Sequence, residues 1–255
     1  MDEQLSGWSD PPARLRTALE QDEFELYCQP IAALAQLASF PMAEVLVRMR
    51  EEERALLPPG DFLPAFEHYG MMVELDRWVV RNTVRHLKSG SRIPRFSINV
   101  SHQTLKDTEF PGYVEAELRA AGVPMDAVLF EIDESDVLAR LENASRFTAA
   151  VKAYGGGVMI DGFGRRAVSF APFKKLALNH VKVDGSVIRK LVKSEAAEAK
   201  LTAVVSVAEM MEMGVVAECV EEDDVLARLR DLKVGYAQGF GVAKPQPIGE
   251  VALKL

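Results

Sequence analysis

Cysteine and histidine are scarce in this sequence of 255 residues, which holds two cysteines and four histidines. Cys28 and Cys219 lie far apart, each in an apolar, strand-like segment, and neither belongs to a CxxC pair. Such cysteines are typical of buried free thiols in a reducing cytosol; a disulfide and a nucleophilic thiol are the alternatives. The histidines do not cluster with them and are expected on helices or the surface, which argues against zinc.

Long hydrophobic segments are also missing. No run of about 18 apolar residues occurs, and the N-terminus, MDEQLSGWSDPP, lacks the charged start and apolar centre of a signal peptide. We therefore expect a cytoplasmic chain, which is equally consistent with the cytoplasmic part of a larger, membrane-anchored protein. Residues 1–12 are expected to be a linker or N-terminal extension, and residues 13–255 the folded domain.

An excess of positive charge is absent, since the formal net charge is −8. This argues against a nucleic acid polymer as partner, because such partners call for clustered lysine and arginine. A small anionic ligand remains compatible, because a local site or a bound metal ion can hold it. The composition, 48% hydrophobic and 27% charged, supports a substantial core.

Short apolar segments alternate with amphipathic, helix-length segments along the whole chain. Eight segments are predicted as strands: 24–34, 42–50, 95–101, 127–135, 156–164, 179–186, 214–221 and 234–245. The connection between the first two is too short for a crossover helix, which predicts an antiparallel pair. The others alternate with helices, which indicates parallel pairing. The fold class is therefore α/β, a (β/α)8 TIM-like barrel with an antiparallel first strand. An open doubly wound sheet is the alternative, although no GxGxxG follows the first strand.

One polar side chain interrupts each strand from the second to the eighth: Glu44, Asn99, Glu131, Asp161, Lys182, Glu218 and Gln238. In such a barrel the carboxyl ends of the strands meet at one mouth. An all-oxygen pocket of Glu44, Asn99, Glu131 and Asp161 would suit Mg²⁺, Mn²⁺ or Ca²⁺. The alternative is that each group merely hydrogen-bonds to a nearby loop, but that coincidence would have to repeat on seven strands.

From about residue 13 to 250 the chain resembles the EAL-domain cyclic di-GMP phosphodiesterases of bacteria. The resemblance rests on eight motifs in order: YCQPI, EVLVR (44–48), INVS, FEIDES, IDGFG, VKVD, AECVE and QGFGVAKPQP. Val45 replaces the alanine of the name-giving EAL motif. The family implies hydrolysis of cyclic di-GMP to linear pGpG with two Mg²⁺ or Mn²⁺ ions.

The resemblance also implies roles for individual residues. The metal ligands would be Glu44, Asn99, Glu131 and Asp161. The catalytic groups would be Lys182, which orients the attacking water, with Glu218 and Glu44. The ligand-binding residues would be Gln29, Leu46, Arg48, Asn99, Asp161, Glu218, Gln238 and Pro245. Glu134 would support the loop after its strand, which the family links to a dimer interface.

The chain departs from the family at Gly162, where the second aspartate of DDFG would bind a second metal ion. Because glycine offers no side-chain oxygen, one metal site is expected to be intact and the second weakened. Arg165 and Arg166 replace a small Thr-Gly pair. Near a phosphate they would strengthen anion binding without helping cleavage, and the alternative is that they point to solvent.

Three functions follow. The first is a catalytically impaired cyclic di-GMP receptor, the second an active phosphodiesterase, and the third an interaction domain that has lost the nucleotide. We expect cyclic di-GMP as ligand, and other domains of a longer chain or a protein effector as partners. Homodimerisation, motility and biofilm signalling are general associations of the family.

Overall fold

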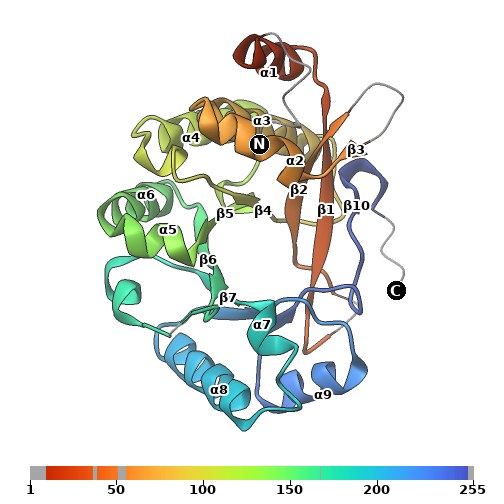
Figure 1. Cartoon of the computed structure of the whole chain (residues 1–255), viewed down its shortest axis with the longest axis vertical. Helices are drawn as coiled ribbons and strands as arrows, with labels where there is room; N and C mark the ends of the chain where they lie inside the picture. Colours follow the sequence, from red (N-terminus) through yellow and green to blue (C-terminus); the bar gives the residue numbers. More distant parts are fainter. Residues whose placement is uncertain (1–9, 37–38, 51–55, 167, 252–255) are drawn as a thin grey trace.

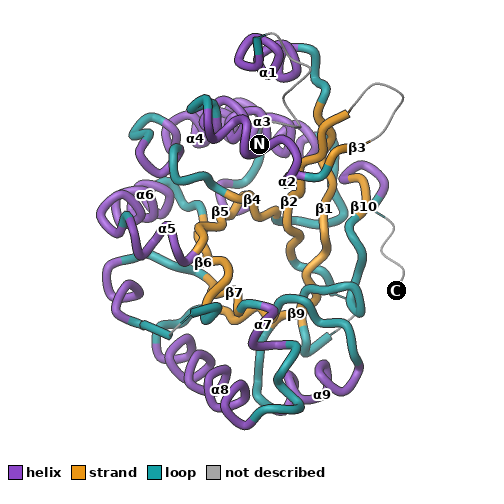
Figure 2. Tube along the Cα trace, in the orientation of Figure 1, coloured by secondary structure: helices purple, strands orange, loops and turns teal. Residues whose placement is uncertain are grey.

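The strands form a closed ring with the helices outside it in the computed structural model, which describes residues 10–36, 39–50, 56–166 and 168–251 (Figure 1, Figure 2). The ring strands are β1 Phe24–Ala33, β2 Met42–Arg50, β4 Phe96–Asn99, β5 Val128–Asp133, β6 Gly157–Phe163, β7 His180–Val183, β8 Gly214–Ala217 and β9 Tyr236–Ala237. Two short strands, β3 Leu56–Leu57 and β10 Gln246–Pro247, pair with β2 and β1 outside the ring.

Strand β1 closes the barrel and runs against both of its neighbours. It pairs antiparallel with β2 from Phe24↔Met49 to Ile31↔Met42, and antiparallel with β9 at Ala32↔Ala237 and Ala33↔Tyr236. Successive strands from β2 through β4 to β9 pair in parallel. The predicted (β/α)8 barrel with an antiparallel first strand is confirmed, and the open sheet is excluded.

The helices surround the ring (Figure 2). They are α1 Pro11–Glu20, α2 Pro59–His68, α3 Met72–Lys88, α4 Phe110–Ala121, α5 Glu134–Ala139, α6 Leu141–Ala153, α7 Gly185–Ile188, α8 Glu195–Met210 and α9 Asp223–Asp231. The apolar spacing of residues 136–156 is that of one amphipathic helix, but Arg140 adopts φ −140° and ψ 44° and separates α5 from α6. None of the helices in the described ranges has the length and apolar character needed to cross a membrane.

Helix α1 packs against the barrel. Leu15 and Ala18 are fully buried, and Asp10 caps the helix by accepting a hydrogen bond from the Ala13 amide at 3.1 Å. The helix thus begins inside the segment predicted as an extension, of which residues 1–9 lie outside the described residues. The division at residue 13 stays a prediction.

The barrel interior has two tiers. The lower tier is apolar and is formed by Ile31, Met42, Leu129, Met159 and Val216, with Tyr236 packed against it. Side chains two apart on a strand point to the same face. Two residues before Ile31 on the antiparallel β1 lies Gln29. Two residues after Met42, Leu129, Met159, Val216 and Tyr236 lie Glu44, Glu131, Asp161, Glu218 and Gln238. This alternation places a polar tier directly above the apolar one, toward the carboxyl ends of the parallel strands.

The remaining scarce residues take unremarkable places, with one correction. Both cysteines are free; Cys28 is buried, and Cys219 is half-buried with its sulfur 3.0 Å from Arg189 Nη2. The expectation that every histidine lies on a helix or the surface is wrong for His180, which lies in β7 with its ring 5.5 Å from the Tyr236 ring. Burial lowers the pKa of His180 to about 4.

Candidate active site

Lys182 lies at the centre of the polar tier. Its side chain is 1% exposed, and Nζ lies 2.6 Å from Glu131 Oε2 and 2.9 Å from Glu44 Oε2. Asp161 Oδ1 and Glu218 Oε1 are farther, at 3.7 and 3.8 Å. One ammonium therefore stands among four carboxylates that come from four other parts of the barrel wall.

Amide side chains fix the orientation of Glu44. Asn99 Nδ2 donates to Glu44 Oε1 at 2.9 Å, and Gln238 Nε2 donates to Glu44 Oε2 at 2.7 Å. Gln238 Nε2 also lies 3.1 Å from Gln29 Oε1, and Gln29 Nε2 donates to the Ala243 carbonyl at 3.0 Å. The structure thus brings together all seven interrupting residues and Gln29.

The excess of carboxylates shows in their proton affinities. Burial raises the pKa of Glu131 to about 8 and that of Glu218 to about 9, although the Lys182 charge opposes both shifts. Burial acts the same way on Glu44, but Lys182 and the hydrogen bonds from Gln238 and Asn99 outweigh it and lower the pKa of Glu44. Burial disfavours the Lys182 charge, yet the surrounding carboxylates raise its pKa well above the usual value. The surrounding carboxylates thus favour the charged form of Lys182, and a cation would compete with protons for the oxygens of Glu131 and Glu218.

The donor set suits one hard divalent cation. Glu131 Oε1 is buried, and no donor in the described part of the chain forms a hydrogen bond with it, which leaves an oxygen suited to a cation. Within residues 10–36, 39–50, 56–166 and 168–251, no three acidic, histidine or cysteine side chains are already arranged as a ligand set. Glu44 and Glu131 instead each form an ion pair with Lys182.

The remaining predicted ligand-binding residues are Leu46, Arg48 and Pro245. Leu46 and Arg48 follow Glu44 at intervals of two on β2, which places all three on one face. Leu46 borders a hollow of about 210 Å³ that also reaches Asp76 and Asn99. The Arg48 guanidinium lies 5.7 Å from the centre of the Tyr27 ring. Pro245 is half-buried, two residues after Ala243.

The loop after β6 differs most from expectation. Glu134 is buried and accepts a hydrogen bond from the Gly164 amide at 3.4 Å, a contact that fits its predicted role in loop support. Arg165 turns back toward Asp184 and Asp133, with Nε–Oδ2 2.8 Å and Nη1–Oδ2 3.2 Å, whereas Arg166 is exposed. Sequence reasoning gave the two aspartates no role at the site. Their signal in the sequence was that each lies at the end of a strand, Asp133 as the last residue of β5 and Asp184 directly after β7, within the motifs FEIDES and VKVD.

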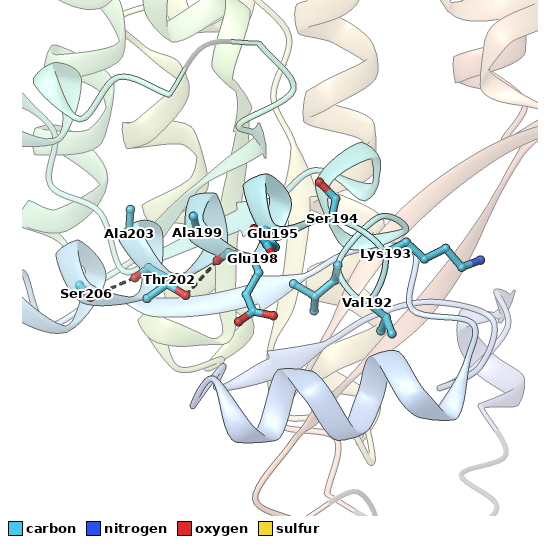
Figure 3. A pocket seen from close by; sticks show the side chains of 10 residues that line it. Val192, Lys193, Ser194, Glu195, Glu198, Ala199, Thr202, Ala203 and Ser206 are labelled. Atoms are coloured by element: carbon cyan, nitrogen blue, oxygen red, sulfur yellow. Dashed lines mark hydrogen bonds between the residues drawn. The ribbon is translucent and has the colours of Figure 1, made fainter.

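A larger hollow, about 620 Å³, lies elsewhere, along α8. Figure 3 shows Glu198, Thr202 and Ser206 on the face of α8 that borders it. No residue of the polar tier lines this hollow. It is therefore separate from the candidate active site.

Known proteins are similar to this chain over most of its length. The EAL domain family matches residues 13–245. The cyclic di-GMP phosphodiesterase PdeF of Escherichia coli (strain K12) is 31% identical over 238 residues, which are 92% of this chain and 32% of that protein. An uncharacterised protein of Mycobacterium tuberculosis is 33% identical over 243 residues, 92% of this chain and 79% of that protein.

Solved structures of EAL-type proteins have the same fold as this chain. The FimX EAL domain from Pseudomonas aeruginosa bound to c-di-GMP superposes with a TM-score of 0.88 at 26% identity, covering 96% of this chain and 100% of that one. The PaMucR phosphodiesterase in complex with c-di-GMP gives 0.83 at 25% identity, covering 93% and 97%. The chain spans about a third of the length of the curated phosphodiesterase PdeF. It belongs to the EAL domain family and is related to cyclic di-GMP phosphodiesterases.

Proposed function

We propose that this chain binds cyclic di-GMP at the barrel mouth and hydrolyses it slowly or not at all. The observation that carries the proposal is the pairing of Gly162 with Arg165. Gly162 supplies no carboxylate, and the Arg165 guanidinium lies where a side chain at position 162 would begin. A second divalent cation would lack a ligand and would meet a positive charge there.

One cation still has a place in this proposal. Glu44, Asn99, Glu131 and Asp161 would hold a single Mg²⁺ or Mn²⁺ ion, which would supply charge neutralisation and polarise a phosphate oxygen. Gln29, Leu46, Arg48, Gln238 and Pro245 would contact the nucleotide. Lys182 would stay protonated and hold Glu44 and Glu131 in position.

The alternative is an active phosphodiesterase. It is favoured by the complete set of other groups, since Lys182 and Glu218 lie within 3.8 Å of each other, and by the relatives named as phosphodiesterases. Transfer of nucleotide occupancy to further domains or to an effector, and homodimerisation, are further proposals from the family.

The test is to titrate the protein with cyclic di-GMP in Mg²⁺ and in Mn²⁺ by calorimetry and to follow pGpG by chromatography. We expect binding without rapid product formation. Arg48→Ala should weaken binding about tenfold or more, as loss of a charged contact does, whereas the exposed Arg92→Ala should not. Rapid formation of pGpG would show that the chain is an active phosphodiesterase. If the chain does not bind cyclic di-GMP, the third function remains, an interaction domain that has lost the nucleotide.

A further inference from the structure

The backbone after Asp161 takes a special conformation. The register of β6 against β7 shifts between Ile160 and Phe163, and Gly162 inside this bulge has φ +66°. Bulges of this kind re-aim neighbouring side chains and are frequent beside active sites. Here the bulge places Gly162, which is buried, next to Asp161.

The Arg165 guanidinium covers this position. A Cβ atom built on Gly162 would lie 2.5 Å from Arg165 Nη2 and 3.0 Å from Cζ, closer than atoms pack. The guanidinium therefore fills the volume that a side chain at 162 would need. Because the guanidinium is the far end of a flexible side chain, it would have to move to admit a side chain at position 162.

Two aspartates hold the guanidinium in place. Asp184 accepts from Nε and Asp133 from Nη1, and each aspartate also accepts from a backbone amide two residues on, that of Ser186 and Ser135. These hydrogen bonds from backbone amides fix the orientation of the two carboxylates independently of Arg165. The side chain is thus oriented from two sides, although it is 52% exposed.

Arg165 has N–H donors left over, among them both N–H groups of Nη2. Nε and Nη1 are used, whereas no acceptor within the described part of the chain takes a hydrogen bond from Nη2, the atom that lies over Gly162. An oriented, half-exposed guanidinium with a spare donor is suited to a phosphate oxygen. Arg166 has no comparable place, since no hydrogen bond or ion pair of its side chain occurs there.

We propose that Arg165 binds a phosphodiester oxygen of the nucleotide and supplies, beside Asp161, the positive charge that a second metal ion would otherwise bring. The inference rests on the proposed function, since it names a residue of the same site. It explains how a mouth lined with carboxylates could hold a dianionic ligand with a single divalent cation. It also links the two departures from the family motif, because Arg165 would supply the positive charge of the metal ion that a carboxylate at 162 would bind.

The test compares three variants by calorimetric titration with cyclic di-GMP in Ca²⁺, which reports binding separately from turnover. Arg165→Ala should bind about ten- to a hundredfold more weakly, as expected for a hydrogen bond between charged groups. The affinity of Arg165→Lys should lie between those of the wild type and Arg165→Ala, because an ammonium keeps the charge but not the planar set of N–H donors of a guanidinium. Arg166→Ala is the matched control and should bind within about twofold of the wild type. Unchanged thermal midpoints would show that the variants remain folded.

Salt separates direct contact from bracing of the loop. If Arg165 contacts phosphate, the difference in affinity between wild type and Arg165→Ala should shrink as salt rises, because salt screens the attraction. A difference that stays constant with salt would overturn the inference, as would equal losses in Arg165→Ala and Arg166→Ala. Wild-type affinity in Arg165→Ala would overturn it while leaving the proposed function intact. If the wild-type protein does not bind cyclic di-GMP, both the proposed function and the inference about Arg165 are wrong.

Discussion

At the scale of single residues, Gly162 and Arg165 are the two positions on which the proposed loss of hydrolysis depends. A carboxylate at 162 cannot simply be restored, for two reasons. The φ of +66° is a region that side chains tolerate poorly, although aspartate is among those that occur there. In addition, the guanidinium would lie against the new carboxylate and neutralise it.

We predict that Gly162→Asp alone gives no gain in hydrolysis, whereas the pair Gly162→Asp and Arg165→Ala raises the rate at least about tenfold. The pair frees the carboxylate from its internal partner and removes the competing charge. Initial rates of pGpG formation in Mn²⁺ would measure the gain, with Arg165→Ala alone as the matched control. Full activity in the single Gly162→Asp variant would contradict the account.

At the scale of elements, Asp76 joins helix α3 to the chain after β4. Its Oδ2 accepts from the Ser101 amide at 3.1 Å and from Thr104 Oγ1 at 2.6 Å. Burial raises the pKa of Asp76 from 3.8 to about 6, although the hydrogen bonds from Thr104 and Ser101 oppose the shift. The charged form is thus held in the fold at a cost.

The expected pH dependence follows from this shift. Because the folded protein binds the proton more tightly than the unfolded chain, Asp76 lowers the free energy of unfolding as pH rises from about 4 to about 6. Asp76→Asn keeps an acceptor oxygen and removes the titration. The wild type should therefore lose stability relative to this variant, by an amount on the order of a few kcal/mol, between pH 4 and pH 7.

Urea unfolding at several pH values would measure this difference. The exposed Asp126→Asn is a suitable control and should follow the wild-type trend. A constant difference between wild type and Asp76→Asn across the range would show that the carboxyl keeps its ordinary proton affinity.

Most elements were predictable because their causes are local. A short apolar segment such as VLFEID became β5, which is buried almost throughout, and the short connection after β1 required an antiparallel neighbour. The break between α5 and α6 was not predictable, because Arg140 leaves the helix without a proline or glycine. The inward turn of Arg165 was not predictable either. It depends on Asp184, 19 residues away, and Asp133, 32 residues away, which only the barrel brings together.

At the scale of the whole molecule, Lys182 connects the barrel wall. From β7 its ammonium reaches carboxylates on β2, β5 and β6 and on the residue after β8. Removing one member of a buried charge group leaves the others uncompensated, which is strongly destabilising. The stability of the barrel is therefore coupled to the charge of its mouth.

We predict that Lys182→Met lowers the free energy of unfolding by about 3–5 kcal/mol without metal. Mn²⁺ should raise the thermal midpoint of this variant more than that of the wild type, because a cation can then take the place of the ammonium. Melting curves with Mn²⁺ and with a chelator would show both effects, and the exposed Lys190→Met should show neither. A variant as stable as the wild type in chelator would contradict the coupling.

The two tiers of the interior have a consequence for how such a domain changes over time. On a strand such as β6 the lower residue, Met159, packs the barrel, while the residue two positions on, Asp161, faces the mouth. Substitutions in the polar tier can thus alter the chemistry of the mouth, while the apolar tier beneath continues to pack the barrel interior. An enzyme lineage built this way can turn into a sensor by a handful of exchanges around the rim, without passing through an unfolded ancestor.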